Sequence, residues 1–329
     1  MRRLLSGRNL ATIAIVLVII IGGRILFPVP LPTIQLPAEK IPGLTIFGFP
    51  ITNTLLATLL ADATILILVY FATRKMEMVP RGLQNVVEWV IEWFMNLAKD
   101  LAGEASARKF FPIMMTIFIL VIVANWWELV PGFDSIGILE PAHSPTVRAY
   151  EIDEVGPIGI LTPRLVKAEA AASEGGHSSE GEHSTGYVLV PFLRAATTDL
   201  NLTVGLAIFV IFWVQVSGVR ALGLRYFTKF FDLRGGIPFV VGLLELISEF
   251  GKILSLSFRL FGNIFAGQVL IFVIPFLIPF LVVLPFYGLE VFVGFMQALV
   301  FAILAMVFLS QAVVRHEGGH EEHRIETGH

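Results

Sequence analysis

Several long apolar segments, each long enough to cross a lipid bilayer, occupy about half of the sequence. In hydrocarbon every backbone N–H and C=O must be bonded within the protein, which restricts spanning segments to helices and closed barrels. A spanning helix needs about 20 apolar residues, whereas a barrel strand needs about half as many. Only 15% of the residues are charged, against about 25% in soluble domains. We therefore predict an all-α polytopic membrane protein with about six membrane segments and one interfacial amphipathic helix.

The order of the apolar segments divides the chain into five parts. They are 1–50, an N-terminal span and an outer Pro-rich segment; 51–131, two spans with an amphipathic helix; 132–190, an exposed outer loop; 191–315, helices that include a hairpin over 237–314; and 316–329, a polar tail. The predicted spans are 10–27, 51–73, 109–130, 197–219, 237–276 and 284–314. The hairpin helices are unusually long, so we expect them to be tilted.

The first apolar run, 10–27, follows three arginines close to the N-terminus. A basic start and a short apolar run are also typical of a signal peptide. No small-residue cleavage site follows the run; Arg24 and the Pro-rich segment 28–50 do. Both readings stay open, and the missing cleavage site favours a retained first span.

The segment 80–103 has the pattern of an amphipathic helix rather than of a span. Apolar residues recur at helical spacing, while charged residues such as Glu88, Glu92 and Asp100 lie off that face. Such a helix lies in the plane of the membrane interface. The recurring apolar residues are Leu83, Val87, Val90, Phe94, Leu97 and Leu101.

Basic residues orient the predicted spans. Lys and Arg are enriched in cytoplasmic loops, and counting spans from the N-terminus places every basic cluster on one side. The clusters are Arg2, Arg3 and Arg8; Arg74, Lys75 and Arg81; Arg108 and Lys109; and the four basic residues of 220–234. We therefore expect both termini in the cytoplasm and the acidic loop 132–190 outside.

The hydrophilic parts of the chain give little sign of a metal or nucleic-acid site. The stretch "SEGGHSSEGEHSTG" (173–186) is typical of an exposed, mobile loop. Histidines in this stretch and in the tail are interrupted by Glu and Gly, which favours solvated segments over metal ligands; they are His177, His183, His316, His320 and His323. Cysteine is absent, and the net charge of −3 does not suggest a nucleic-acid binder. We expect no cofactor and no bound metal.

The segment 237–276 carries polar side chains on one narrow face, although it is otherwise apolar. Its 40 residues would form a helix roughly 60 Å long, about twice the thickness of the hydrocarbon core. At about 100° per residue, five polar residues fall within about 40° of Arg259 and share its face, namely Glu245, Ser248, Lys252, Ser255 and Asn263. Gln268 falls about 180° away. In the last segment, Glu290 and Gln297 are seven residues apart and share a face.

Arg259 is the residue in this stripe that structural packing explains least well. Arginine keeps its charge in proteins, and a guanidinium in the middle of a membrane needs an anion or a water-filled cavity. None of the neighbouring residues at helical contact distance is acidic. We therefore expect the anionic partner to come from another helix or another chain. The serines and Gln297 could instead simply hydrogen-bond helices together.

Four segments of the sequence resemble parts of a known protein family. The segment "LLELISEFGKILSLSFRLFGNIFAGQVL" resembles the signature of the a subunits of F-type ATP synthases, the membrane stators that face a rotating ring of c subunits. The blocks "ATTDLNLT" (196–203), "WWELVPGF" and "MQALVFAILAMVFLS" also resemble parts of that family. The resemblance covers about 50–315 and places the proton-translocating helices within 191–315.

The resemblance implies two offset proton half-channels in a bacterial inner membrane, with Arg259 between them facing a c-subunit carboxylate, and peripheral-stalk b subunits as further partners. It implies an outer path lined by Glu290, Gln268, Asp199, Asn201 and Gln297, and an inner path lined by Glu245, Ser248 and Ser255. Asn263 would orient groups near Arg259. Asp199 also suits a helix N-cap, so both roles stay open for it.

One departure from the family concerns the outer path. Gln268 and Glu290 stand where some bacterial members have a carboxylate and a histidine, respectively. The resemblance therefore implies that the titratable group of this path is Glu290, without a histidine.

Two other classes of protein compete with this interpretation. A secondary transporter would show internal repeats with broken helices in both halves, and the sequence shows no repeat. A purely structural anchor would not require a charge at Arg259. The chain also lacks a G-x-x-x-x-G-K-[ST] phosphate loop, so it would not make or hydrolyse ATP alone.

Overall fold

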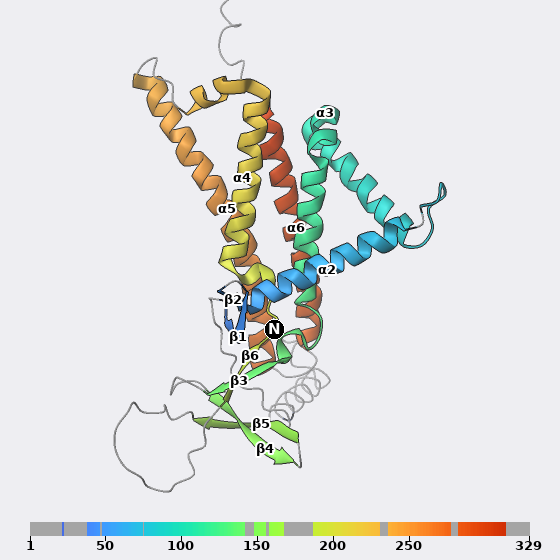
Figure 1. Ribbon diagram of the computed structural model, residues 1–329, viewed down its shortest axis with the longest axis vertical. Coiled ribbons are helices and arrows are strands. Elements are labelled where there is room, and N and C mark those ends of the chain that lie inside the picture. Colours follow the sequence, from blue (N-terminus) through green and yellow to red (C-terminus); the bar gives the residue numbers. More distant parts are fainter. Residues whose placement is uncertain are drawn as a thin grey trace, which may run out of the picture. The chain divides into compact units, whose positions relative to one another are not determined.

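The computed structural model describes residue 22 and residues 38–46, 48–74, 76–141, 148–155, 158–167, 187–230, 236–277 and 282–313. These residues form five long helices, labelled in Figure 1 as α2 (Asn53–Thr73), α3 (Leu83–Trp127), α4 (Leu200–Leu222), α5 (Gly236–Leu277) and α6 (Val283–Val313). All five are long and apolar enough to cross a membrane, which confirms the predicted fold class. The candidate span 10–27 lies outside the described residues except for Gly22.

Helix α3 contains the predicted boundary between an amphipathic helix and a span. Gly103 interrupts its helical conformation with φ 75° and ψ 161°, a region of backbone space that is essentially restricted to glycine. Figure 1 shows the sharp bend of α3. The break falls at the end of the predicted segment 80–103. Phe94 is buried before the break, and its ring packs at 4.1 Å against that of Phe118 after it.

The helices and strands group into two compact units, and most helices contribute to both. The first unit comprises residues 1–61, 124–199 and 262–295, and the second comprises 62–123, 200–261 and 296–329.

In the first unit, a short hairpin precedes α2. Strands β1 (Lys40–Ile46) and β2 (Phe49–Thr52) are antiparallel, with Ile46 opposite Phe49. Gly48 lies in the turn with φ 82°, a left-handed conformation that glycine adopts without strain. The Asn53 N–H then donates to the Glu39 carbonyl at 3.1 Å. Sequence reasoning had assigned this region only as a Pro-rich segment.

The first unit also contains a four-stranded antiparallel sheet in the segment that we predicted as an exposed outer loop. Its order is β3 (Gly137–Pro141), β6 (Tyr187–Pro191), β4 (Arg148–Val155) and β5 (Ile158–Lys167). β3 and β6 pair from Gly137 with Pro191 to Pro141 with Tyr187. A side chain at Gly137 would overlap the backbone of Val190, so this close strand pairing requires glycine.

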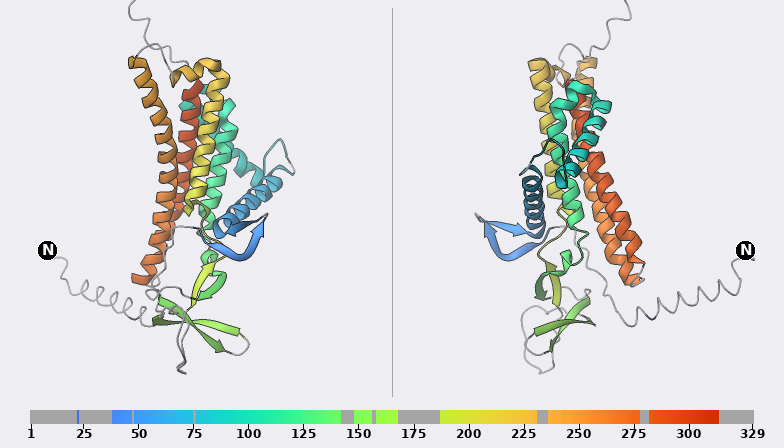
Figure 2. Two further views of the ribbon diagram at one scale, coloured as in Figure 1. Left: turned by 60° about the vertical axis from the view of Figure 1, so that its left-hand side comes forward. Right: turned by 90° about the vertical axis from the view of Figure 1, so that its right-hand side faces the viewer.

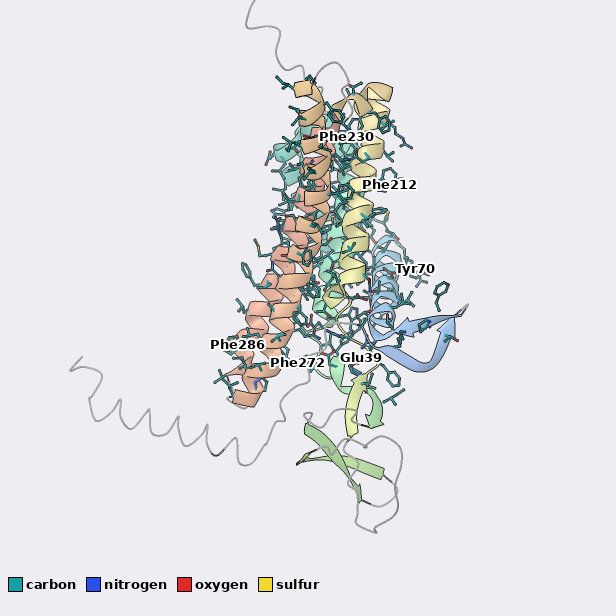
Figure 3. The ribbon with its side chains drawn as sticks, turned by 90° about the vertical axis from the view of Figure 1, so that its left-hand side faces the viewer. Glu39, Tyr70, Phe212, Phe230, Phe272 and Phe286 are labelled. Atoms are coloured by element: carbon teal, nitrogen blue, oxygen red, sulfur yellow. The ribbon has the colours of Figure 1, made fainter. Side chains whose placement is uncertain are left out.

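The helical part of the first unit includes the C-terminal end of α5 and the N-terminal part of α6, which form a hairpin. Figure 2 shows these helices side by side there, and Figure 3 shows Phe272 of α5 and Phe286 of α6 near the same end of the hairpin. Two short 3₁₀ helices, η1 (Phe133–Ser135) and η2 (Ala196–Thr198), complete this unit. The hairpin was predicted from the two long apolar segments.

The second unit packs parts of α3, α4, α5 and α6 around a core of small, aliphatic and aromatic side chains. Ala302, Ala305 and Met306 of α6 are fully buried. After α4, the 3₁₀ helix η3 (Gly223–Lys229) folds back, and the Tyr226 ring covers Gly218 so closely that a Cβ there would overlap it. Glycine at 218 therefore permits this contact between α4 and η3.

Candidate proton-path site

The predicted polar stripe lies on the exposed face of α5. Ser248, Ser255, Arg259 and Asn263 are all exposed, and the guanidinium of Arg259 donates to Ser255 Oγ at 3.4 Å. Leu256 and Leu260, which lie about 60° and 100° around the helix from Arg259, are buried. The stripe is therefore available to a partner outside the chain.

Gln268 and Glu290 are buried in the first unit, at 5% and 4% exposure. Their helices meet at Gly267, where an added Cβ would overlap the Glu290 carboxylate. Glycine at 267 therefore gives room for a carboxylate between α5 and α6. Gln268, the next residue, forms a side-chain hydrogen bond with Asp134 of η1.

Hydrogen bonds from the end of α3 hold α6 in register near Glu290. Asn125 Nδ2 donates to the Gly294 carbonyl at 3.1 Å, and Trp126 Nε1 donates to the Val291 carbonyl at 3.3 Å. Thr197 of η2 donates to Asn125 Oδ1 at 2.7 Å. Asn125 is 2% exposed, and both the nitrogen and the oxygen of its side-chain amide have hydrogen-bond partners within the protein. These bonds fix the rotation of α6 and hence the direction of Glu290.

Three carboxylates gather around this point; those of Glu128 and Glu290 are buried and that of Asp134 is half-buried. Glu128 follows α3 and is 8% exposed, and neither of its carboxylate oxygens has a hydrogen-bond partner among the described residues. Asp134 Oδ1 and Glu290 Oε1 are also buried oxygens without a hydrogen-bond partner among the described residues. A buried charged oxygen without a donor is strongly disfavoured, whereas a protonated carboxyl or one solvated by water is not. The cluster is therefore suited to accept protons.

Arg194 supplies the positive charge of this cluster. It is 7% exposed, and its burial lowers its pKa, while the carboxylates of Glu39, Asp134, Glu128 and Asp199 raise it. Burial raises the pKa of Asp134 to about 6, against the opposing effects of Arg194 and Gln268. We call Glu128, Asp134, Arg194, Gln268 and Glu290 the first-unit cluster.

Burial also raises the pKa of Glu128 well above its ordinary value. The neighbouring charges of Asp134 and Glu290 raise it further, and Arg194 opposes them. Three carboxylates thus lie near a single guanidinium. Protons bound to the carboxylates would neutralise the negative charge that the guanidinium does not balance.

Asp199 lies at the edge of the same unit, between η2 and α4. Its Oδ2 accepts a hydrogen bond from Thr54 Oγ1 at 2.9 Å. Asn53, the residue before Thr54, donates through Nδ2 to Glu39 Oε2 at 3.4 Å. The start of α2 is thereby joined to Asp199, the residue that follows η2, by polar side chains.

The remaining predicted residues lie in the second unit. Gln297 is 4% exposed and follows Glu290 by two turns of α6. Asn201 is exposed in the first turn of α4, and Glu245 of α5 is half-buried. Burial, followed by the Glu249 and Glu245 carboxylates, raises the pKa of Tyr226 to about 12, which places negative charge close to η3.

Sequence reasoning missed Glu128, Asp134 and Arg194. A possible signal was present for Glu128, because it directly follows the tryptophan pair that ends a predicted span. In the part of the chain that the structure describes, no group of His, Cys, Asp or Glu is placed to hold a metal ion. The five histidines considered above lie outside the described residues.

A multi-pass helical protein with buried carboxylates and an exposed arginine on one long helix belongs to the class of ion-translocating membrane proteins. Comparison with known proteins agrees. A family model for the ATP synthase A chain matches residues 55–310. The chain is similar to ATP synthase subunit a of Helicobacter hepaticus, with 31% identity over 261 residues, or 79% of this chain and 89% of that protein.

It is also similar to ATP synthase subunit a of Campylobacter jejuni, with 32% identity over 257 residues, or 77% of this chain and 86% of that protein. The chain therefore belongs to the ATP synthase subunit a family, the proton-channel and stator subunit of the membrane sector. The resemblance seen in the sequence is confirmed.

Proposed function

We propose that the exposed stripe on α5 is the surface that faces a ring of c subunits. Arg259 is the residue of this surface that interacts with the ring carboxylate. The stripe is polar and exposed although α5 is otherwise apolar. An ionised carboxylate of the ring would be stabilised beside a permanent cation in a medium of low effective dielectric. The ring carboxylate is then the anionic partner that none of the described residues of this chain supplies beside Arg259.

The outer half-channel is assigned to the first-unit cluster together with Asp199, Asn201 and Gln297. Glu290 is its central titratable group, because its buried carboxylate lies against Gly267 and next to Gln268. Glu128 and Asp134 lead to it as proton acceptors. A proton taken up from outside passes along these groups and neutralises the ring carboxylate, which can then enter lipid.

The inner half-channel is assigned to Glu245, Ser248 and Ser255. The half-buried carboxylate of Glu245 is available to accept the proton that a ring carboxylate releases beside Arg259. Asn263, one turn beyond Arg259, orients groups near the guanidinium. The positive charge of Arg259 prevents protons from passing directly between the two half-channels.

The partners and orientation complete the proposal. The chain works with a c ring and with peripheral-stalk b subunits in the inner membrane of a bacterium. Both termini are cytoplasmic and the 132–190 segment is outside, as the basic clusters indicate.

The observation that carries this proposal is that Arg259 is exposed and Gln268 is buried on opposite faces of the same helix. Two proton paths on different faces of a helix require a moving group that carries the proton from one path to the other. A continuous pore would need no such carrier. Substitution of Arg259 tests this directly, in membrane vesicles that hold the complete ATP synthase. We expect both Arg259→Ala and Arg259→Lys to reduce coupled ATP synthesis to near zero. Alanine removes the charge, whereas lysine lacks the planar fork of the guanidinium and can deprotonate when it is desolvated.

The two variants should differ in passive proton leak after the catalytic head is stripped off. Arg259→Ala removes the charge barrier and should conduct protons without rotation, while Arg259→Lys should leak less as long as it is charged. Retention of substantial ATP synthesis in Arg259→Ala would refute the role given to Arg259.

A further inference from the structure

Helix α5 carries two cations, Lys252 and Arg259, and only one of them turns towards the exposed face. The two residues are seven positions apart, so their Cα atoms lie about 20° from each other around the helix. Arg259 is exposed. The Lys252 side chain is only 23% exposed, because its ammonium turns towards the interior of the second unit.

Two side chains hold the ammonium there. Lys252 Nζ donates to Glu249 Oε1 at 2.8 Å, and it lies 5.4 Å from the centre of the Phe308 ring of α6. The Glu249 side chain is 7% exposed, and its Cα lies about 60° further round the helix than Lys252, away from the stripe. An ammonium in a cation–π contact and an ion pair is bound on two sides.

This arrangement is unlike an ordinary ion pair on a helix surface. The pair formed by Glu104 and Arg108 in α3 has a similar separation of 2.7 Å, but its side chains are 64% and 69% exposed. Exposed pairs of that kind contribute little. Burying Glu249 requires a compensating charge, and that requirement fixes the direction of the lysine side chain.

The position of the ammonium matters because of the distance between the two cations along the helix. Seven residues correspond to about 10 Å, which a freed lysine side chain could largely span towards Arg259. A second cation on the stripe would then attract the same ring carboxylate. Two cations would hold the ionised carboxylate more strongly and delay its departure.

We propose that Glu249 and Phe308 hold the ammonium of Lys252 off the exposed stripe, so that Arg259 is the one cation of α5 that faces the ring. This inference rests on the proposed function, because it presumes that the stripe faces a c ring. Glu249 and Phe308 are then positioning residues for proton coupling and not members of the proton path.

The first experiment compares Glu249→Gln with the double variant Glu249→Gln/Lys252→Gln in vesicles that hold the complete ATP synthase. In the single variant the lysine is freed, and we expect ATP-driven proton pumping to fall about tenfold, which corresponds to about 1.4 kcal/mol. The double variant removes the freed cation and should recover most of the wild-type rate. Glu104→Gln, which breaks the exposed pair of α3, serves as the matched control and should leave pumping unchanged.

A double variant as inactive as Glu249→Gln would overturn the inference, since Glu249 would then act by itself. Wild-type pumping in Glu249→Gln would overturn it as well. Phe308→Leu is a milder variant that keeps the buried ion pair, and a smaller loss of pumping is expected from it. The amount of this chain that co-purifies with the complex corrects each rate for assembly.

A second measurement does not depend on activity. A membrane-permeant carbodiimide activates a carboxylate, which forms an amide with an adjacent lysine while one water is transferred to the reagent. We expect mass spectrometry of the wild type to show an amide between Glu249 and Lys252 within one chain. In Glu249→Gln and Phe308→Leu, amides between Lys252 and a ring carboxylate should become detectable or more frequent. Such an inter-chain amide as the main product of the wild type would contradict the inference.

The outcome can be separated from a failure of the proposed function. If Arg259→Ala retains ATP synthesis, the stripe does not face the ring and the general proposal fails. If Arg259→Ala is inactive but the double variant shows no recovery, only the role of Glu249 is refuted.

Discussion

Gly267 of α5 and Glu290 of α6 share one contact, at which the missing side chain of the glycine leaves the space that the carboxylate occupies. We expect Gly267→Ala to displace Glu290 and to reduce proton transport strongly, because the added Cβ would overlap the carboxylate. Overfilling a packed site of this kind destabilises a protein by about 1 to 3 kcal/mol. Proton pumping and the thermal unfolding of the purified complex measure the two effects.

The same helix offers a control for this substitution. A Cβ at Gly262 would meet no atom within 4 Å, so Gly262→Ala should leave stability almost unchanged. If the two alanine variants were equally harmful, the contact with Glu290 would not be the cause.

Glu290 itself is predicted to be required for its ability to titrate. Glu290→Gln keeps the shape of the side chain but holds no exchangeable acid, so we expect proton-driven ATP synthesis to fall while the complex still assembles. Glu290→His should restore part of the rate, since imidazole titrates near neutral pH. Wild-type proton flux in Glu290→Gln membranes would show that the outer path does not pass through this residue.

Asp134 should make the stability of the protein depend on pH. Burial raises its pKa from 3.8 to about 6, so the folded state favours the protonated form. The corresponding stabilisation is fully present below about pH 4 and is lost as the pH rises through about 6, a difference on the order of 3 kcal/mol. Asp134→Asn mimics the neutral form and should flatten this dependence. Thermal unfolding in detergent, measured between pH 4 and 7, tests this. A parallel change of the unfolding temperature in the wild type and in Asp134→Asn would contradict the prediction.

The bend of α3 should depend on glycine at position 103. Its φ of 75° and ψ of 161° are accessible to other residues only at a cost of order 1 to 3 kcal/mol. We therefore expect Gly103→Ala to lower the unfolding temperature. Gly205→Ala in α4 is the comparison, because Gly205 has open space around its Cα and alanine is the better helix former. An equal decrease in both variants would argue against backbone strain at Gly103.

The sequence was most informative where helical periodicity decides the outcome. The exposed stripe around Arg259 and the burial of Gln268 follow from the 100° step between successive residues, which holds along any continuous helix. The boundary near 103 was also predictable, because the amphipathic pattern ends there and a long apolar run begins at about residue 110. These features depend on neighbours close in the chain.

Arg194 and Glu128 could not be assigned in this way. They are brought together by segments that lie more than sixty residues apart, and no periodic pattern joins them. The strands within 132–190 were missed for another reason. Their apolar stretches are short and adjoin a polar segment, so composition dominated the prediction, whereas strand pairing depends on long-range contacts.

The opposite orientations of Arg259 and Gln268 on α5 also bear on how such a chain can vary in length. One inserted residue between them would rotate everything beyond it by about 100°, so Gln268 and Gly267 would leave the contact with Glu290 while Arg259 kept its place. The hydrogen bonds from Asn125 and Trp126 impose the same restriction on α6. Strands β4 and β5 carry no such constraint from helical rotation. Among relatives, we expect insertions and deletions to accumulate in the extramembrane sheet and to be excluded from 259–268 and 290–297.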